Sequence, residues 1–271
     1  MNDPRALADE LTTAYENRQT MAAPSSREGG LDLATAYAVE AELARRRRAG
    51  GHTTVGRKVG YANKAMWRAL KLDTLVWANM YDDTVHDAAN GSATLSVTRM
   101  SSPKIEPEIV FKLRQPLAGG EVDAATVLES VEWLALGFEI IDCVFPEWKF
   151  QPADFVAAYG LHAALVVGEP RIVDASAIPA LAEALPRFKV RLMKNGEVAE
   201  EGSGRNSLRS PALCLGELAA AIARQPGAEA LAAGDLISSG TLTTSFAIAP
   251  GDTWTADVDG MALSPLTLRI E

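Results

Sequence analysis

The stretch KIEPEIVF, residues 104–111, combines a strand-like pattern with two acidic residues. In a β-strand, residues two apart point to the same face, so Glu106 and Glu108 are expected to project side by side. Neighbouring carboxylates repel each other unless a positive charge lies between them. A divalent cation meets that need, and hard oxygen ligands favour Mg²⁺, Mn²⁺ or Ca²⁺ over Zn²⁺. The alternative, a solvated strand face, fits poorly with the apolar residues around the two acids.

A second apolar run, LALGFEIIDCV at residues 134–144, is interrupted by two more acids. A carboxylate in a buried strand is costly unless it is paired or bound to a cation. Glu139 is therefore predicted to be a third metal ligand. Asp142 has the opposite strand parity, so we interpret it as a structural residue or as support for a ligand.

Outward from these two runs, short β-like segments dominate the chain after Gly51, with helical periodicity before it. There is no βαβ alternation and no repeat, which indicates an α+β fold. We divide the chain into an N-terminal helical segment, residues 1–75, and a β domain, residues 76–271. The Asn195-Gly196 pair predicts a hairpin turn. Helices are predicted over residues 4–20, 32–48 and 211–224, and strands over residues 54–59, 93–97, 105–113, 134–144, 163–167, 188–194, 236–239, 253–258 and 266–270.

Composition excludes several classes of function. The net charge of −9 over 271 residues argues against a nucleic-acid partner, which needs a basic surface. No stretch approaches the roughly 20 apolar residues of a membrane span, and the first residues lack a signal-peptide core, so a cytoplasmic location is expected. The run Arg45–Arg48 is interpreted as cations at a helix C-terminus rather than as an anion site. Arg57 and Lys149 are expected at the surface.

Several motifs together resemble one branch of a known superfamily. The segment VGRKVGYANK, residues 55–64, is similar to the G-x-K-[IV]-G motif of the 2-hydroxypentadienoate hydratases and 4-oxalocrotonate decarboxylases, within the fumarylacetoacetate hydrolase superfamily. The resemblance covers roughly residues 30–271. Its other landmarks follow in order: YDD (81–83), PKIEPE (103–108), GFEIID (137–142), GSG (202–204), AGD (233–235) and SGT (239–241).

The resemblance implies a mixed β-sandwich roll with the N-terminal helical segment attached, and 2-oxo or 2-hydroxy-dienoate substrates. It implies Mg²⁺ or Mn²⁺ held by Glu106, Glu108 and Glu139. Proton transfer would fall to Lys58 and Asp83, with Asp82 beside them, although an exposed strand lysine and a turn aspartate are the alternatives. Ser239, Gly240 and Thr241 would bind the substrate carboxylate. His162 is either a hydrogen-bonded core histidine or a further substrate contact.

The expected activity is addition of water to a 2-hydroxy-2,4-dienoate, giving a 4-hydroxy-2-oxo acid, in aromatic catabolism. Where relatives carry polar side chains, residues 156–162 are mostly apolar, which favours a mono-acid over a dioate. The alternatives are a 4-oxalocrotonate-type decarboxylase, a C–C hydrolase of β-diketo acids, and a non-catalytic partner subunit. A homo-oligomer is expected, as is association with a related decarboxylase or hydratase.

Overall fold

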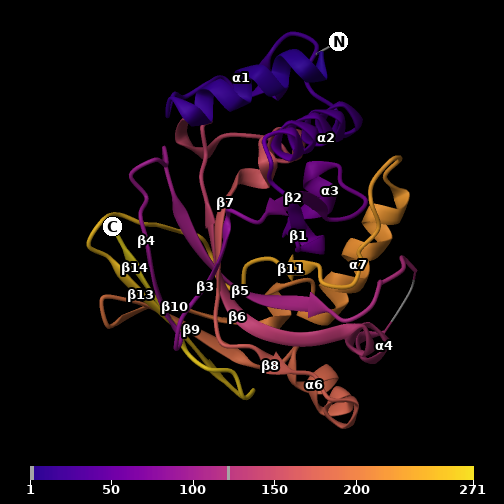
Figure 1. Cartoon of the computed structure of the whole chain (residues 1–271), viewed down its shortest axis with the longest axis vertical. Coiled ribbons are helices and arrows are strands. Elements are labelled where there is room, and N and C mark those ends of the chain that lie inside the picture. The colour runs from indigo at the N-terminus through magenta and orange to yellow at the C-terminus, as the bar shows by residue number, and fades with distance from the viewer. Residues whose placement is uncertain (1–2, 121–122) are drawn as a thin grey trace.

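The computed structural model describes residues 3–120 and 123–271, and its strands form two sheets (Figure 1). The strands are β1 Thr54–Gly60, β2 Val76–Tyr81, β3 Val85–Asp87, β4 Ser92–Leu95, β5 Lys104–Leu113, β6 Val131–Ile141, β7 His162–Val167, β8 Arg171–Ile172, β9 Lys189–Lys194, β10 Glu197–Ser203, β11 Leu236–Ser238, β12 Phe246–Ala247, β13 Thr253–Asp259 and β14 Leu266–Ile270. The nine-stranded sheet has the order β2-β1-β11-β5-β6-β7-β3, with β12 paired to β5 and β8 to β6. The five-stranded sheet has the order β10-β9-β13-β14-β4. The α+β prediction is confirmed.

The ends of the helices follow local capping rules. Asp32 accepts a hydrogen bond from the Thr35 amide at the start of α2 (Leu33–Ala49), and Gly50 ends the same helix. At α7, Pro211 occupies the first turn, where its missing N–H costs nothing. The helices are α1 Pro4–Glu16, α2 Leu33–Ala49, α3 Lys64–Leu70, α4 Ala124–Glu129, α5 Pro152–Ala157, α6 Ile178–Ala184 and α7 Pro211–Arg224.

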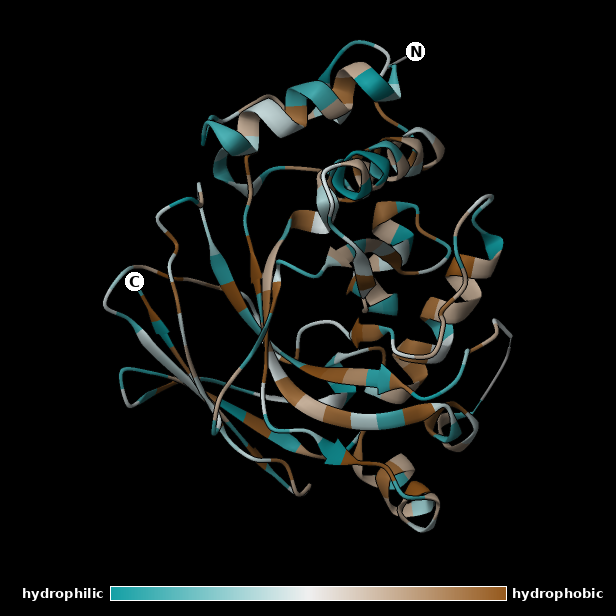
Figure 2. Ribbon diagram, viewed as in Figure 1, coloured by the Kyte–Doolittle hydropathy of each residue, from teal (hydrophilic) through white to brown (hydrophobic). Residues whose placement is uncertain are grey.

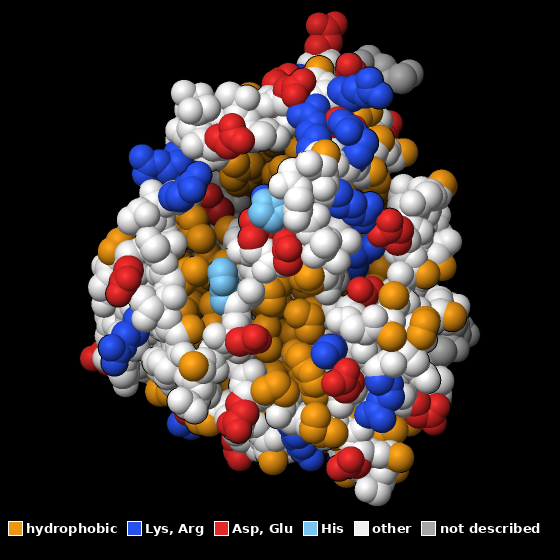
Figure 3. Space-filling view, viewed as in Figure 1, with side chains coloured by type: hydrophobic (Ala, Val, Ile, Leu, Met, Phe, Trp, Pro, Cys, Tyr) orange, Lys and Arg blue, Asp and Glu red, His pale blue; other side chains and the backbone are white. Residues whose placement is uncertain are grey.

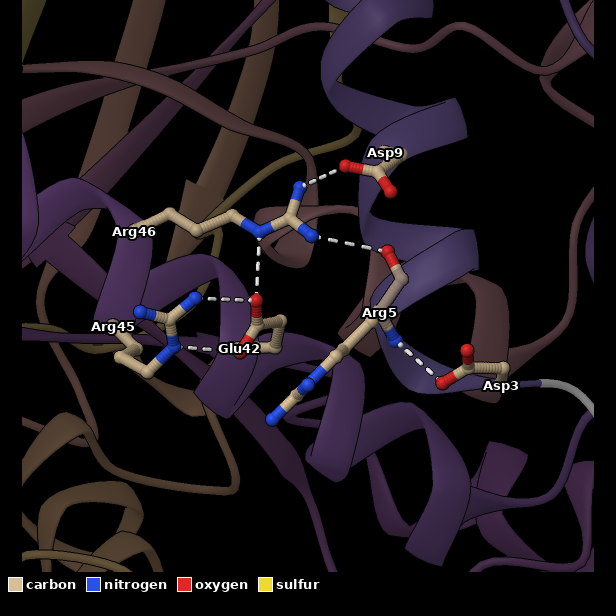
Figure 4. A network of polar contacts seen from close by, with 6 residues as sticks. All are labelled: Asp3, Arg5, Asp9, Glu42, Arg45 and Arg46. Atoms are coloured by element: carbon tan, nitrogen blue, oxygen red, sulfur yellow. Dashed lines mark hydrogen bonds and ion pairs between the residues drawn. The ribbon is translucent and has the colours of Figure 1, made fainter.

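Charged side chains join α1 to α2 at the top of the molecule (Figure 4). The Arg46 guanidinium donates to Asp9 at 2.6 Å, to the Arg5 carbonyl oxygen at 3.1 Å and to Glu42 at 2.8 Å. Arg45 also donates to Glu42, and the two arginines lower the pKa of Glu42 to about 2. Arg46–Arg48 lie in the last turn of α2, as predicted for cations at a helix C-terminus, and Arg45 and Arg46 also pair with acids, which the sequence did not predict.

The longest strands, β5 and β6, form the centre of the larger sheet. They pair antiparallel from Lys104 opposite Ile141 to Leu113 opposite Val131. Both are hydrophobic over most of their length (Figure 2), and Phe111 is fully buried. Apolar burial of this kind is the dominant favourable term in folding, so the acids in these two strands are exceptions that need an explanation.

Most predicted elements are confirmed, and the exceptions have physical reasons. The helix predicted over 211–224 is α7, and β9 and β10 pair across the Asn195-Gly196 turn. The first helix ends at Glu16 rather than at residue 20. The analysis of the pattern missed β2, in which every residue is buried, because a strand covered on both faces shows no alternation.

The N-terminal part of the chain is not purely helical. The segment predicted as residues 1–75 contains α1, α2 and α3, but it also contains β1, which lies between β2 and β11.

The surface prediction for Arg57 on β1 is wrong, since this residue is 4 % exposed. Its guanidinium lies over the Trp77 ring at 5.4 Å. Arg57 and Lys58 point to opposite faces of β1 and both are buried, so other parts of the molecule cover both faces of this strand.

Gly56→Ala should destabilise the fold strongly. Gly56 has φ of +155°, and an added Cβ would lie 1.8 Å from the Leu236 carbonyl oxygen, at the parallel pairing of β1 with β11. We expect the free energy of unfolding to fall by about 3 kcal/mol or more, measured by urea denaturation. The control is Gly120→Ala, because an added Cβ there meets nothing within 4 Å. Equal stability of the two variants would contradict this reading of β1.

Candidate active site

Three glutamates from the two central strands lie together. Glu106 and Glu108 share one face of β5, and Glu106 is directly opposite Glu139 on β6. One carboxylate oxygen from each lies within 4.8 Å of the others. Glu108 and Glu139 are fully buried, whereas Glu106 is partly exposed and faces a cavity. The structure therefore brings the three predicted ligands together.

Lys58 reaches the same cluster from β1. Its Nζ lies 3.0 Å from Glu139 Oε2 and donates to the Gly160 carbonyl oxygen at 2.9 Å. The ammonium also lies 4.7 Å from the centre of the Phe155 ring. The side chain is 2 % exposed, so the alternative of an exposed strand lysine is wrong. Lys58 is the positive charge that the buried carboxylates need.

His162, at the start of β7, contacts the other oxygen of Glu139. Its Nδ1 lies 2.9 Å from Glu139 Oε1, and its Nε2 lies 3.0 Å from Thr84 Oγ1. Both ring nitrogens are thus engaged, and the ring does not line the cavity that Lys58 and Glu106 line. The contacts fit the hydrogen-bonded core histidine, which orients Glu139, better than a substrate contact.

The turn after β11 holds Glu108. Ser238 donates its hydroxyl to Glu108 Oε2 at 2.5 Å, and the Gly240 amide donates to the same oxygen at 2.8 Å. Gly240 and Thr241 also line the cavity, whereas Ser239 is buried and does not. Sequence reasoning missed Ser238, because a serine at the end of a buried strand carries no distinguishing signal.

Burial and mutual repulsion set the charge states of the glutamates. Burial raises the pKa of Glu106 to about 7, although Lys58 partly offsets the effect. The pKa of Glu108 rises well above its ordinary value, first because of burial and then because of Glu139 and Glu106. Burial also acts on Glu139, but Lys58 and His162 outweigh it and lower the pKa of Glu139. Glu139 is therefore the ionised member of the cluster, with Lys58 as its counter-ion.

The cluster lies at one side of a cavity of about 490 Å³. Apolar and aromatic side chains form much of its wall: Tyr61, Ile141, Trp148, Phe150, Phe155 and Leu161. Glu200, Thr243 and Thr244 also line it. Lys58 is the single lysine or arginine that lines this cavity, counting the described residues alone.

Asp82 and Asp83 lie elsewhere, in the exposed turn between β2 and β3. His52 Nδ1 lies 3.3 Å from Asp82 and 3.5 Å from Asp83, and Arg47 pairs with Asp83. Neither aspartate lines the cavity with Glu106. Asp83 and His162 instead line a second cavity, of about 400 Å³. Residues of α1 also line this second cavity. Figure 3 shows a hollow with hydrophobic side chains below that helix.

Asp142 has the structural role that its strand parity indicated. Its carboxylate accepts hydrogen bonds from the amides of Ser101, Ser102 and Cys143, which fixes the loop before β5. Because its carboxylate binds these backbone amides, Asp142 does not take part in the cluster of three glutamates. The second acid of the apolar run thus shapes the backbone that leads into the strand of Glu106 and Glu108.

The donor set fits a divalent cation. Within residues 3–120 and 123–271, Glu108 Oε1 is buried without a hydrogen-bond partner, and Glu139 Oε2 has only its ion pair with Lys58. An unsatisfied buried carboxylate oxygen is costly. With Glu106, these two groups make three carboxylates whose oxygens lie within 4.8 Å of one another, which matches the all-oxygen sites of Mg²⁺, Mn²⁺ or Ca²⁺. Thiol and free imidazole ligands are missing from the described cluster, which argues against zinc.

This chain and its fold have counterparts among known proteins. The family model for the fumarylacetoacetate (FAA) hydrolase C-terminal domain matches residues 59–269, and the chain belongs to that family. A 2-hydroxypent-2,4-dienoate hydratase of Pseudomonas putida is 30% identical over 217 residues, which are 79% of this chain and 92% of the relative. A 4-oxalocrotonate decarboxylase of Pseudomonas sp. (strain CF600) is 27% identical over 94% of this chain and 93% of its own.

A solved structure is similar over nearly the whole chain. The 4-oxalocrotonate decarboxylase of Pseudomonas putida G7, complexed with magnesium and adipate, has a TM-score of 0.87 and 26% sequence identity. The match covers 99% of this chain and 97% of that protein. None of the helices in the described parts of the chain is long and apolar enough to cross a membrane.

The metal-free protein should lose stability as the pH rises from about 4.5 to about 7, and the loss should level off above that. In this range the raised pKa of Glu106 means that the folded protein holds a proton that the unfolded chain has already released, so folding becomes less favourable as the pH rises. Added Mg²⁺ or Mn²⁺ should raise the thermal midpoint more near about pH 8 than near about pH 6, where it must displace a proton. Thermal unfolding with and without metal measures this. In Glu106→Gln the pH dependence should shrink, and an unchanged profile would count against the assignment.

Proposed function

We propose that this protein is a metal-dependent hydratase, in which Glu106, Glu108 and Glu139 hold Mg²⁺ or Mn²⁺. It adds water to a 2-hydroxy-2,4-dienoate of the 2-oxo-4-pentenoate type and forms a 4-hydroxy-2-oxo acid. The observation that carries this proposal is the cluster of three glutamates and Lys58 beside one largely apolar cavity, which Glu106 and Lys58 line. A homo-oligomer and a cytoplasmic location stay predictions.

The bound metal would supply Lewis acidity toward the carboxylate and the 2-oxygen of the substrate. In the reaction, the dienol gives up its 2-hydroxyl proton and gains a proton at C5, which forms the 2-oxo-3-enoate. The oxygen of water then bonds to C4 and releases a proton, and C3 receives a proton. We assign to Lys58 the proton at the 2-oxygen, because Lys58 lies beside Glu139 and lines the cavity. We assign no proton transfer to Asp82 or Asp83, since they do not line this cavity.

A mono-acid fits the cavity better than a dioate. A second carboxylate buried in the cavity needs a cation or several hydrogen-bond donors. Lys58 already pairs with Glu139, and the other charged groups among the described lining residues are acids, Glu106 and Glu200. Of the apolar stretch 156–162 that prompted this expectation, only Leu161 lines the cavity. The aromatic side chains nearby support the same conclusion.

Decarboxylation of a dioate is the second candidate, and Lys104 is the observation that favours it. Lys104 has the same strand parity as Glu106 on β5, and its Nζ lies 4.0 Å from the centre of the Trp148 ring. Because Trp148 lines the cavity, a rotation of the Lys104 side chain would offer a cation to a distal carboxylate. The contact with Trp148 holds the ammonium outside the lining.

Loss of one carboxylate should abolish tight metal binding. Glu108→Gln retains an oxygen that accepts from Ser238 and Gly240 but removes the negative charge. We expect the affinity for Mg²⁺ or Mn²⁺ to fall on the order of a hundredfold or more, measured by calorimetric titration. Glu132→Gln is the control, because Glu132 is a half-exposed acid on β6 that pairs with Lys112. Unchanged affinity in Glu108→Gln would refute the proposed ligand set.

A direct competition tests the reaction. The metal-loaded protein is given 2-hydroxypenta-2,4-dienoate and 4-oxalocrotonate at equal concentration, and ultraviolet loss and CO₂ release are followed. We expect water addition to the mono-acid to outpace CO₂ release. The reverse result would mean that the protein is a decarboxylase and not a hydratase.

Lys58→Met should lower turnover on the order of a hundredfold, the scale of a lost proton-transfer group. Lys112→Met, at a half-exposed lysine of β5, is its control.

A further inference from the structure

We propose that the cavity selects dienoates with an extended apolar tail, and that Glu200 excludes tails that end in a carboxylate. The inference rests on the proposed function, because it places the 2-oxo acid group at the glutamate cluster. It goes further by naming the part of the substrate beyond C4. The cavity's size, its aromatic wall and the place of Glu200 carry it.

The cavity is larger than a five-carbon acid requires. Its volume is about 490 Å³, within the range of roughly 300–1,000 Å³ that holds drug-sized ligands. A short dienoate bound at the glutamate cluster would leave much of this space to water. Water in an apolar cavity makes few hydrogen bonds, so apolar substrate atoms that displace it gain affinity.

The wall beyond the cluster is built from rings that support one another. Trp148 and Phe150 follow β6 with ring centroids 6.3 Å apart. Phe155, on α5, meets Tyr61 edge-on, with centroids 5.4 Å apart. The Trp148 indole donates to Ser102 Oγ at 2.9 Å, which fixes the ring in place. A tail that leaves the cluster on this side therefore meets aromatic faces. Polar side chains also line the cavity, but four of them already donate to other acceptors: Asn206, Thr241, Thr243 and Thr244.

Glu200 brings a negative charge to the same cavity from β10. Its Oε2 accepts hydrogen bonds from the Thr244 amide at 2.9 Å and from the Thr244 hydroxyl at 2.5 Å. Ion pairs for Glu200 are not found among the described residues, so its charge is not cancelled locally. Glu201 is next along the strand but pairs with Arg191 and lines a different cavity. A tail carboxylate would meet repulsion from Glu200, whereas an apolar tail would not.

Binding of unreactive 2-oxo acids tests the inference separately from catalysis. Saturated 2-oxo acids lack the conjugated double bond that water attacks. We would titrate the Mg²⁺-loaded protein with 2-oxopentanoate, 2-oxooctanoate and 2-oxoadipate. Affinity should increase about three- to fourfold for each added methylene, the scale of apolar transfer, and 2-oxoadipate should bind more weakly than 2-oxopentanoate. Equal affinity of the two mono-acids would overturn the apolar tail site.

Three variants separate the parts of the proposal. Glu200→Gln keeps an acceptor for Thr244 and should tighten 2-oxoadipate binding on the order of tenfold, while 2-oxooctanoate binding stays unchanged. Glu201→Gln removes the same charge one residue away and should change neither. Trp148→Ala should reduce the gain from the longer tail but leave 2-oxopentanoate binding unchanged. Thermal midpoints check that each variant is folded.

The outcomes distinguish this inference from the proposed function. If no dienoate is hydrated but the chain-length preference persists, the function is wrong and the tail site stands. If the five-carbon dienoate is hydrated but the tail adds no affinity, the tail site is wrong and the function stands. A preference for 2-oxoadipate that is lost in Lys104→Gln would overturn the role of Glu200, because Lys104 would then receive the distal carboxylate.

Discussion

The carboxylate of Glu139 is the point on which the rest of the site depends. It is fully buried, with Lys58 at one oxygen and His162 at the other. A buried charge that loses its partner destabilises a protein by several kcal/mol, so β1, β6 and β7 must keep their mutual positions. The register of β5 against β6 then places Glu106 opposite Glu139. A one-residue slip would turn the glutamates of β5 to the other face of the sheet.

One lysine does not balance three carboxylates. Lys58 supplies a single positive charge, and Ser238 with Gly240 supplies hydrogen bonds to Glu108 but no charge. The repulsion that remains between the carboxylates is relieved in one of two ways. Either Glu106 and Glu108 stay protonated, or a cation binds between the three glutamates. The sheet around the cluster is apolar and tightly packed, so this imbalance is confined to a small volume next to the cavity.

Strand periodicity and the cost of buried charge were sufficient to predict the glutamate cluster and the α+β fold. They could not predict contacts between distant segments. His162 lies 23 residues from Glu139, and Lys58 lies 102 residues from Gly160, and nothing local in the sequence pairs them. Arg57 shows a different failure, because a positive charge on a strand suggests exposure only when one face of that strand is open.

The glutamates and Lys58 lie within strands of the larger sheet, whereas Trp148, Phe150 and Thr244 lie on the segments between strands. Segments that connect strands tolerate substitution and insertion better than a central sheet does. Substrate range can therefore diverge among descendants of this chain through changes in those connecting segments, while the chemistry inherited in the sheet stays intact. The same separation makes the connecting segments the place to randomise in a laboratory evolution of new tail preferences.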